Sequence, residues 1–452
     1  MIFRTKAATW LVLASVLTAP VVMGGCAHAP SPDLATAPVA APEALGFDGN
    51  GLKALDAAMG KAVANGEIAG LSTLLVRHGK VVQFNTYGQA SVATNVAMGK
   101  DTIHRIFSMT KPVTGVALMI LYEEGKWNLD DPVSKYLPEL ANLSVMTGVD
   151  GDGKMILVPA KRPPTMRELM SHTAGFGYGL SPNNAIDDMF RAKQVLGAPT
   201  LSELVTRTAS IPLKFQPGEN WSYSVSVDLQ GRIVEILSGQ TLGDFFATRI
   251  FKPLNMNDTA FSVPPEKLNR FSDLFAINPQ TGKLIQVTPA VAPQLPTFTN
   301  PKALQSGGGG LVSTSNDYGR FAQMILNGGQ LDGKRLLKPE TIALMGQSAI
   351  APGVNADNGL LQSLGTSAFS FSRGMGFGLN FMVVTDPQLA GVAVGKGTLS
   401  WGGAAGTWFW IDPANDLYFV GMIQRMGGTR GMTDLSGLSR TLTYQALTNP
   451  KR

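Results

Sequence analysis

Apolar residues follow strand-like patterns near both ends of the chain and helix-like spacing in its middle. A helical pattern at 51–64 is followed by two β-rich runs, 71–76 and 81–87, which the turn sequence at 77–80 separates. Short β-rich runs on either side of a turn predict a hairpin. The apolar stretch 113–122 is rich in helix formers, as expected of a buried helix. The first part of the chain should therefore supply a helix, two antiparallel strands and a second, buried helix.

The middle of the chain is broken by proline and glycine into short helical stretches. These stretches are 165–171, 201–209, 227–238 and 242–250. After the glycine run 307–310, an amphipathic helix is expected at 317–326. The strands expected next are 376–384, 392–395, 399–402, 407–411 and 417–423, with a terminal helix at 435–446. Two groups of strands separated by helices predict one sheet that is completed by both ends of the chain.

The predicted fold class is α/β, of the α+β kind. An antiparallel sheet with flanking helices would be built from about 46–126 and 300–450, and a mostly helical lobe, about 127–299, would be inserted between them. A site in such a protein is expected in the cleft between the lobes, a common place for ligand pockets.

The first 25 residues have the pattern of an export signal. Arg4 and Lys6 precede an uncharged apolar stretch, and Gly24-Gly25 lead directly to Cys26. Small residues before a cysteine resemble a lipobox, in which cleavage leaves a lipidated N-terminal cysteine. We therefore expect a signal peptide at 1–25, lipidation of Cys26, and a flexible tether in the Ala/Pro-rich residues 26–45.

Two other outcomes stay open for this segment. Cleavage after Ala29 would give an ordinary secreted protein, because Ala27-His28-Ala29 has the small-x-small pattern. An uncleaved membrane anchor is disfavoured, since the apolar stretch is short and contains Pro20. In the favoured reading the protein is exported by a bacterium and is periplasmic or attached to the membrane through Cys26.

Composition narrows the chemistry. Cys26 is the only cysteine, so the mature chain has no disulfide, thiolate metal site or cysteine nucleophile. The net charge is +5 and the basic residues are scattered, which argues against a nucleic-acid partner. The four histidines have no paired metal-ligand spacing, and Asp150-Gly151-Asp152-Gly153 is read as a solvated turn. No metal or organic cofactor is predicted.

The pair Ser108 and Lys111 is the main candidate for catalysis. A serine hydroxyl needs a base beside it, and residues three apart on a helix lie on one face. Pro112 is tolerable only in a first turn, so the helix should begin close to Ser108. The alternative is a helix-capping serine and a surface lysine, since so short a motif also occurs by chance.

Two later elements supply partners for this pair. Tyr223 stands before a helical stretch, and a tyrosine near a lysine ammonium can exchange a proton with a serine. Trp401-Gly402-Gly403-Ala404 places glycines at the end of an expected strand, where another group approaches the backbone closely. Each element alone also fits simple packing.

Together, these elements resemble the serine β-lactamase and penicillin-recognising superfamily, and more narrowly the class C β-lactamase-like esterases of family VIII. Ser108 to Lys111 match Ser-x-x-Lys, Tyr223-Ser224-Val225 match the Tyr-Ser/Ala-x motif, and Trp401-Gly402-Gly403 match the esterases' third motif. The segments 169–176, 253–256 and 308–314 are also similar. The resemblance extends from about 46 to 446 and implies a β-lactamase/transpeptidase-like fold and an acyl-enzyme.

The resemblance also implies the roles of the residues. Ser108 would be the nucleophile, and Lys111 and Tyr223 would together act as the base. Which of these two carries the proton at each step stays open. The backbone N–H groups of Ser108 and Ala404 would form the oxyanion hole. The expected substrate pocket consists of Trp401, Gly402, Gly403, Phe176, Tyr178 and Val225. His172 and His104 are expected to have packing roles.

Two departures favour a neutral ester over a β-lactam. Val225 stands where class C β-lactamases have an asparagine, and Trp401 stands where they have a lysine. Both changes remove polar recognition of a lactam. The expected activity is hydrolysis of carboxylic esters, most simply short-chain ones. A β-lactamase or D-amino-acid peptidase, and a catalytically silent binding protein on the same fold, remain as alternatives.

Overall fold

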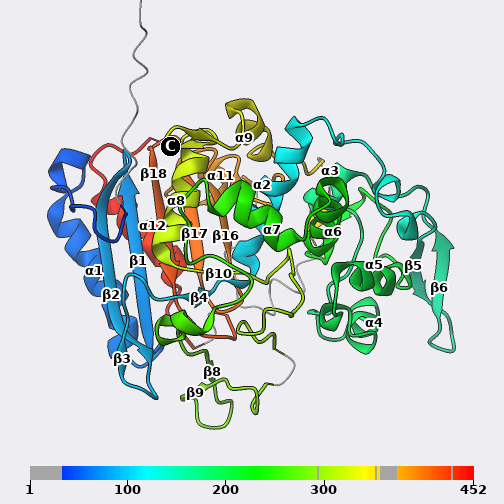
Figure 1. Cartoon of the computed structure of the whole chain (residues 1–452), viewed down its shortest axis with the longest axis horizontal. Coiled ribbons are helices and arrows are strands. Elements are labelled where there is room, and N and C mark those ends of the chain that lie inside the picture. The colour runs from blue at the N-terminus through cyan, green and yellow to red at the C-terminus, as the bar shows by residue number, and fades with distance from the viewer. Residues whose placement is uncertain (1–32, 293–294, 352–353, 357–373, 429–430, 452) are drawn as a thin grey trace, which may run out of the picture.

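An eight-stranded antiparallel sheet forms the centre of the larger lobe (Figure 1). The structure is a computed structural model that describes residues 33–292, 295–351, 354–356, 374–428 and 431–451. The strand order is β14-β15-β16-β17-β18-β1-β2-β3. The strands are β1 (Gly70–Arg77), β2 (Lys80–Ser91), β3 (Val96–Ala97), β14 (Met375–Phe377), β15 (Met382–Val384), β16 (Leu399–Gly402), β17 (Trp408–Asp412) and β18 (Leu417–Met422).

The sheet is joined in its middle by the pairing of β1 with β18, strands from opposite ends of the chain. Side chains alternate between its two faces, as the pleat requires. In β17, Trp408 and Trp410 enter one hydrophobic cluster, while Phe409 and Ile411 enter the other. Both faces are therefore covered.

Helices from distant parts of the sequence cover the two faces. On one face α1 (Gly49–Ala64) packs beside α12 (Leu435–Ala446). On the other face lie α2 (Thr110–Glu123) and α8 (Ser315–Leu326), and α8 contacts β18 and β1. Among these, α2 carries the candidate nucleophile segment at its N-terminus and leads toward the second lobe (Figure 1).

The second lobe is mostly helical and lies on the right in Figure 1. Its helices are α3 (Met166–Met170), α4 (Ala185–Ala192), α5 (Leu201–Ala209), α6 (Ser226–Ser238), α7 (Leu242–Phe246) and the π-helix η6 (Ala247–Phe251). The helix α6 contacts α2, α3, α5 and α7, so it is the element that joins this lobe to the nucleophile helix.

The remaining elements are short. They are η1 (Glu43–Leu45), β4 (His104–Arg105), η2 (Phe107–Met109), η3 (Val133–Lys135), η4 (Pro138–Leu140), β5 (Ser144–Val149), β6 (Met155–Pro159), η5 (Val195–Gly197), β7 (Asn220–Trp221), η7 (Pro265–Arg270), β8 (Phe275–Ile277), β9 (Leu284–Gln286), β10 (Val312–Ser313), β11 (Gln330–Leu331), β12 (Lys334–Arg335), α9 (Pro339–Met345), β13 (Asn355–Ala356) and α11 (Pro387–Ala390).

The predicted fold class is confirmed, with two local corrections in the C-terminal strands. The expected strand 376–384 is a hairpin, because Gly378 N–H bonds to Phe381 O and Asn380 adopts a φ of +64° between β14 and β15. The expected strand 392–395 is a loop after α11, in which Gly395 N–H bonds to the Asp412 carboxylate. The first run thus supplies the two paired strands β14 and β15 at one edge of the sheet, whereas the second run lies outside the sheet.

The predicted signal peptide and Cys26 lie outside the described residues, as does part of the expected tether. The described part, 33–45, packs on the sheet lobe. Leu34 is 8% exposed and its N–H bonds to Asn316 Oδ1 at 2.9 Å, while Ala40 N–H bonds to Val81 O at 3.0 Å. The apolar contact of Leu34 outweighs the flexibility expected from composition, so this part is folded and not a free linker.

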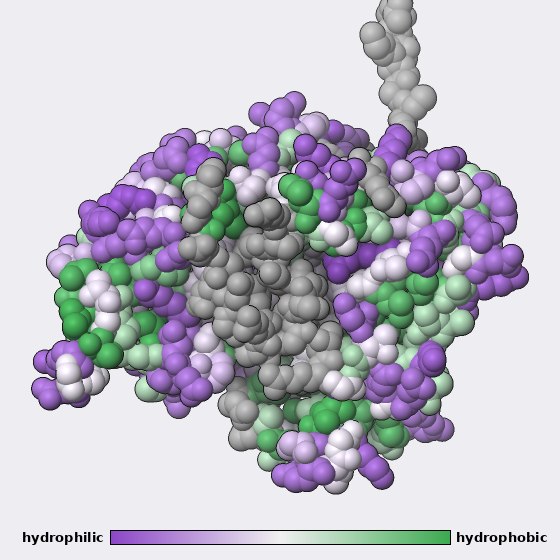
Figure 2. Space-filling model, turned by 180° about the vertical axis from the view of Figure 1, so that it is seen from behind, coloured by the Kyte–Doolittle hydropathy of each residue, from purple (hydrophilic) through white to green (hydrophobic). Residues whose placement is uncertain are grey.

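The β5–β6 hairpin projects from the helical lobe and exposes apolar side chains. Val149, Ile156 and Leu157 are 56%, 45% and 47% exposed. Apolar surface is visible at the left edge of Figure 2, where the 180° turn brings this end of the molecule. The turn at 150–153 forms the hairpin tip, with the Asp152 and Lys154 N–H groups bonded to Asp150 Oδ1. Within the described ranges, no helix has the length and apolar character to cross a membrane.

Candidate active site

Ser108 lies at a strand-to-helix junction that is held by a segment from the far end of the chain. β4 pairs with β10, and Ile106 N–H bonds to Leu311 O at 3.1 Å. Phe107 then adopts a φ of +41°, a left-handed conformation that is strained for a residue with a side chain. The short helix η2 (Phe107–Met109) leads directly into α2, so the predicted helix start near Ser108 is observed.

Lys111 lies one turn beyond Ser108 and is almost completely buried, with 1% of its surface exposed. Its Nζ donates to Ser108 Oγ at 3.3 Å, to Tyr178 Oη at 3.0 Å and to the Gly308 carbonyl at 2.6 Å. Burial lowers the pKa of Lys111 to about 7, and the charge of Asp228 opposes this shift. At neutral pH a substantial fraction of Lys111 is therefore uncharged and able to accept a proton.

Tyr223 approaches Ser108 from the helical lobe. Its hydroxyl donates to Ser108 Oγ at 2.6 Å, and its ring centroid is 4.5 Å from Lys111 Nζ. Burial raises the pKa of Tyr223, and interactions with Ser108 and Trp401 oppose the rise. Because the pKa moves upward, this phenol holds its proton at neutral pH. The structure thus brings Ser108, Lys111 and Tyr223 together.

Aromatic side chains fix the ring of Tyr223. Trp401 lies 5.5 Å from it and His172 lies 5.1 Å from it, measured between ring centroids. His172 Nδ1 is 2.9 Å from Ser224 Oγ, and burial lowers the pKa of this histidine well below its usual value. A neutral His172 that contacts Tyr223 and not Ser108 agrees with the packing role expected from the sequence.

The third motif approaches the nucleophile through its glycines. A Cβ added to Gly403 would lie 2.4 Å from the carbonyl oxygen of Ile106 and 2.3 Å from Thr407 Oγ1. Only a glycine allows the end of β16 to come this close to the turn before Ser108. Within the described parts of the chain, neither Ser108 nor Ala404 donates its backbone N–H to another group.

A second layer of polar groups lies behind Lys111. Asp228, in the first turn of α6, is fully buried. Its Oδ1 accepts from the Ser306 hydroxyl at 2.5 Å and from Gly308 N–H at 3.1 Å. Burial raises the pKa of Asp228, whereas Lys111 and these two hydrogen bonds lower it. An ionisable acid is therefore held in the core next to the amine of the site.

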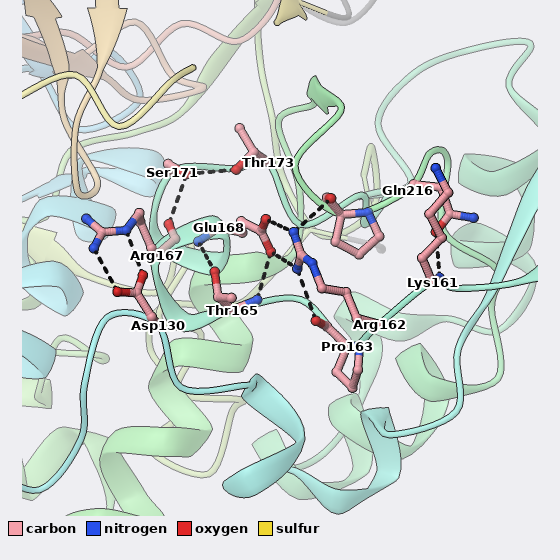
Figure 3. A network of polar contacts seen from close by, with 11 residues as sticks. Asp130, Lys161, Arg162, Pro163, Thr165, Arg167, Glu168, Ser171, Thr173 and Gln216 are labelled. Carbon is pink, nitrogen blue, oxygen red and sulfur yellow. Dashed lines mark hydrogen bonds and ion pairs between the residues drawn. The ribbon is translucent and has the colours of Figure 1, made fainter. Parts of the chain in front are cut away.

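The loop that carries Tyr178 is held by buried and surface ion pairs. Asp187 Oδ1 accepts from the N–H groups of Tyr178 and Gly179 at 2.7 and 2.6 Å, and its Oδ2 is 2.9 Å from Lys214 Nζ. At the start of the same loop, Thr165 and Glu168 form a capping box at α3 (Figure 3). Both ends of the loop are thereby anchored.

Figure 3 also shows how that capping box is braced from outside. Arg162 donates to both carboxylate oxygens of Glu168, at 2.8 and 2.5 Å, and to Pro217 O at 3.2 Å. Arg167 pairs with Asp130 at 3.1 Å. This network ties the segment before α3 to the segment before Tyr223.

The predicted pocket residues occupy different positions. Gly402 and Gly403 are half-buried at the end of β16, and Trp401 contacts the ring of Tyr223. Tyr178 directs its hydroxyl at Lys111. Phe176 and Val225 lie in the core with 2% and 0% of their surfaces exposed, and His104 is also buried. In the described ranges no group of three or more His, Cys, Asp or Glu side chains is arranged to hold a metal ion.

The β-lactamase family model matches residues 55–440. The chain belongs to the β-lactamase family. Esterase EstB of Burkholderia gladioli is 30% identical over 396 residues, which are 83% of this chain and 91% of that esterase. Lovastatin esterase of Penicillium rubens is 31% identical over 365 residues, 76% of this chain and 86% of its own.

A solved structure of this family has the same fold. EstCE1, described as a hydrolase with promiscuous acyltransferase activity, superposes with a TM-score of 0.71 and 26% identity, over 87% of this chain and 98% of EstCE1. The resemblance expected from the three motifs is confirmed, and the relatives of this β-lactamase-family chain include esterases.

Sequence reasoning missed the second layer behind Lys111. Asp228 follows Tyr223 by five residues and stands between the apolar Val227 and Leu229, and an acid among apolar residues is a signal for a buried polar site. Gly308 belongs to a glycine run that the sequence marks only as similar to the family. Its place beside Lys111 depends on contacts between residues 197 positions apart.

Proposed function

We propose that this protein hydrolyses neutral carboxylic esters through a covalent acyl-Ser108 intermediate. The observation that carries the proposal is the position of Ser108 Oγ between two proton-exchanging groups, 3.3 Å from Lys111 Nζ and 2.6 Å from Tyr223 Oη. A serine hydroxyl in hydrogen-bond contact with its base is the arrangement required for nucleophilic attack. The esterase relatives support the same reaction class.

The pKa directions assign the proton transfers. Neutral Lys111 takes the proton of Ser108 as Oγ attacks the ester carbonyl, because its pKa is lowered to about 7 whereas that of Tyr223 is raised. The protonated Lys111–Tyr223 pair then returns this proton to the leaving alcohol. Water attacks the acyl-enzyme with the same groups acting in reverse, which releases the acid and restores Ser108.

The oxyanion of each tetrahedral intermediate is assigned to the backbone N–H groups of Ser108 and Ala404. Neither group donates to another atom in the described ranges, and the glycine at 403 brings the two segments together. Donors that are free and fixed before the reaction stabilise developing charge without reorganisation.

The substrate is proposed to be uncharged near its carbonyl group. Val225 and Trp401 replace the polar residues that bind a lactam amide and carboxylate in class C β-lactamases, and both are buried apolar side chains here. A site that offers no hydrogen bonds to polar groups of a substrate discriminates against it. A chromogenic cephalosporin should therefore be cleaved at least about a hundredfold more slowly than a short ester.

The test uses p-nitrophenyl esters of increasing acyl length. The protein should turn over the short esters, and Ser108→Ala should lose essentially all activity, whereas Ser202→Ala on the surface of α5 should retain it. Labelling by a fluorophosphonate probe should follow the same pattern. Equal turnover by the Ser108→Ala variant would refute the acyl-serine mechanism, and absence of labelling in the unmodified protein would favour a silent binding protein.

Transfer of the acyl group to an alcohol is a second candidate function. EstCE1 is described as a hydrolase with promiscuous acyltransferase activity, and the same acyl-Ser108 would serve both reactions. With butanol present, the products should contain a butyl ester in addition to the acid. A product mixture of acid alone at every alcohol concentration would limit the function to hydrolysis.

We propose further that the protein is exported and anchored through a lipidated Cys26. The apolar N-terminal stretch followed by Gly24-Gly25-Cys26 supports this. The mass of the mature N-terminus should correspond to a diacylated cysteine, and Cys26→Ala should release the protein from the membrane fraction. Cleavage after Ala29 would instead give an unmodified N-terminus that begins at Pro30.

A further inference from the structure

The proposed reaction gives no role to Asp228, a buried acid with one unsatisfied carboxylate oxygen. Oδ1 accepts two hydrogen bonds, but Oδ2 is buried and has no hydrogen-bond donor in the described parts of the protein. A buried carboxylate oxygen without a donor is costly unless a positive charge lies near it. Lys111, in the N-terminal turn of α2, is buried and interacts electrostatically with Asp228.

Gly308 shows how closely the groups of this layer approach one another. A Cβ added to Gly308 would lie 2.5 Å from Asp228 Oδ2 and 2.6 Å from Tyr178 Oη. Both oxygens therefore lie against the same side of Gly308, whose carbonyl accepts from Lys111. Asp228, Tyr178, Gly308 and Lys111 form one continuous cluster.

The hydrogen bond from Lys111 restricts where the hydroxyl proton of Tyr178 can point. Lys111 Nζ donates to Tyr178 Oη, so the phenol's own proton must point to a different acceptor. Burial raises the pKa of Tyr178 well above its usual value, which keeps that proton in place. Asp228 Oδ2 lies on the same side of Gly308, but no hydrogen bond joins it to Tyr178 Oη in the described chain, so its contribution to this cluster is its negative charge.

We propose that Asp228 is the buried counter-ion of Lys111 and that this acid sets the pH range in which Ser108 reacts. The proposal rests on the proposed function, in which Lys111 is the base. Asp228 is a positioning residue, since no contact joins it to Ser108 in the described chain. The other titratable groups that face Lys111 are Tyr178, Tyr223 and His172, which are neutral at neutral pH.

The direction of the effect follows from charge. A carboxylate beside Lys111 favours the ammonium form and so raises the pKa of Lys111, against the effect of burial. Removing that charge leaves burial unopposed, and Lys111 becomes neutral at a lower pH. In a plot of the rate of Ser108 reaction against pH, the acid limb should therefore move toward lower pH when Asp228 is neutralised.

The experiment measures the second-order rate constant for labelling of Ser108 by a fluorophosphonate between pH 5 and 9. This reaction reports activation of Ser108 whichever ester is the substrate, so the proposal is testable even if ester hydrolysis fails. In Asp228→Asn the acid limb should shift down by roughly one pH unit, the effect of one nearby charge. The plateau rate should also fall, since an amide holds Lys111 less firmly.

Two further variants make the result decisive. Ser306→Ala keeps the carboxylate but removes a hydrogen bond that stabilises its charge, so it should shift the limb in the same direction by less. Asp412→Asn removes an equally buried carboxylate at the end of β17 and should lower stability without any shift. If Asp228→Asn does not fold, Ser306→Ala decides. An unmoved limb in these variants, or an equal shift in Asp412→Asn, would overturn the proposal.

Discussion

The two sides of the Lys111 amine differ in their chemistry. On the front side, Ser108 and Tyr223 are hydroxyl groups that exchange protons with substrate, and Ser108 is partly exposed. On the back side, the Gly308 carbonyl, Tyr178 and Asp228 are sealed in the core. The same amine thus has one set of partners that reacts and another that holds it.

The difference explains why both layers are needed. A buried lysine has a lowered pKa because desolvation disfavours its charge, but an amine with no fixed acceptors would also rotate away from the serine. The front layer uses the resulting basicity, and the back layer limits it and fixes the direction of Nζ. Variants of the two layers should therefore differ in kind as well as in size.

The largest loss of kcat is expected when Tyr223, on the front side, is replaced. Tyr223→Phe keeps the ring that packs on Trp401 and His172 but removes the hydroxyl 2.6 Å from Ser108 Oγ. The value of kcat should fall about 10²- to 10³-fold, the usual contribution of a positioned acid–base group. Steady-state kinetics with a p-nitrophenyl ester would measure this loss, and a variant with nearly full kcat would remove Tyr223 from the proton transfer.

A smaller loss of kcat is expected when Tyr178, on the back side, is replaced. Tyr178→Phe keeps the ring 4.9 Å from Lys111 Nζ and removes one acceptor from the amine. An ordinary hydrogen bond contributes roughly 0.5–1.5 kcal/mol, so kcat should fall about two- to tenfold with KM little changed. The same assay compares the two tyrosines directly. A loss as large as that of Tyr223→Phe would mean that the layers do not divide the work in this way.

The smallest effect is expected outside both layers. Arg162→Ala removes the ion pairs to Glu168 in the network of Figure 3, whose arginine is 47% exposed. Because exposed ion pairs are screened by water, the free energy of unfolding should fall by only about 1 kcal/mol, and kcat should not change. Urea denaturation measures the first quantity. A clear loss of kcat would show that the loop carrying Tyr178 depends on this network.

Much of the fold follows from the sequence because apolar periodicity is a local signal. The helices at 201–209 and 435–446 and the strand at 399–402 have the bounds that the pattern predicts. The β5–β6 hairpin and the split of 376–384 into two strands do not follow, since a short apolar run looks the same in a strand, a turn or a loop. Tertiary contacts decide those cases.

Some residues of the site can likewise be predicted from the sequence, and others cannot. Ser108, Lys111 and Tyr223 are predictable because motif order and spacing mark them. Asp228 and Gly308 are not, because neither has a motif of its own and both reach Lys111 through packing between lobes. Phe176 and Val225 are correctly placed near the motifs in sequence, but their side chains point into the core.

The meeting of the two chain ends has a practical consequence. Asp48 N–H bonds to Ala446 O at 2.8 Å and Thr448 N–H bonds to Gly46 O at 3.0 Å, beside the β1–β18 junction. A short linker that joins these neighbouring segments would let new termini be opened at the exposed hairpin tip 150–153. Circular permutation at that point would keep every strand pair of the sheet, and would make the helical lobe the place where synthesis begins and ends.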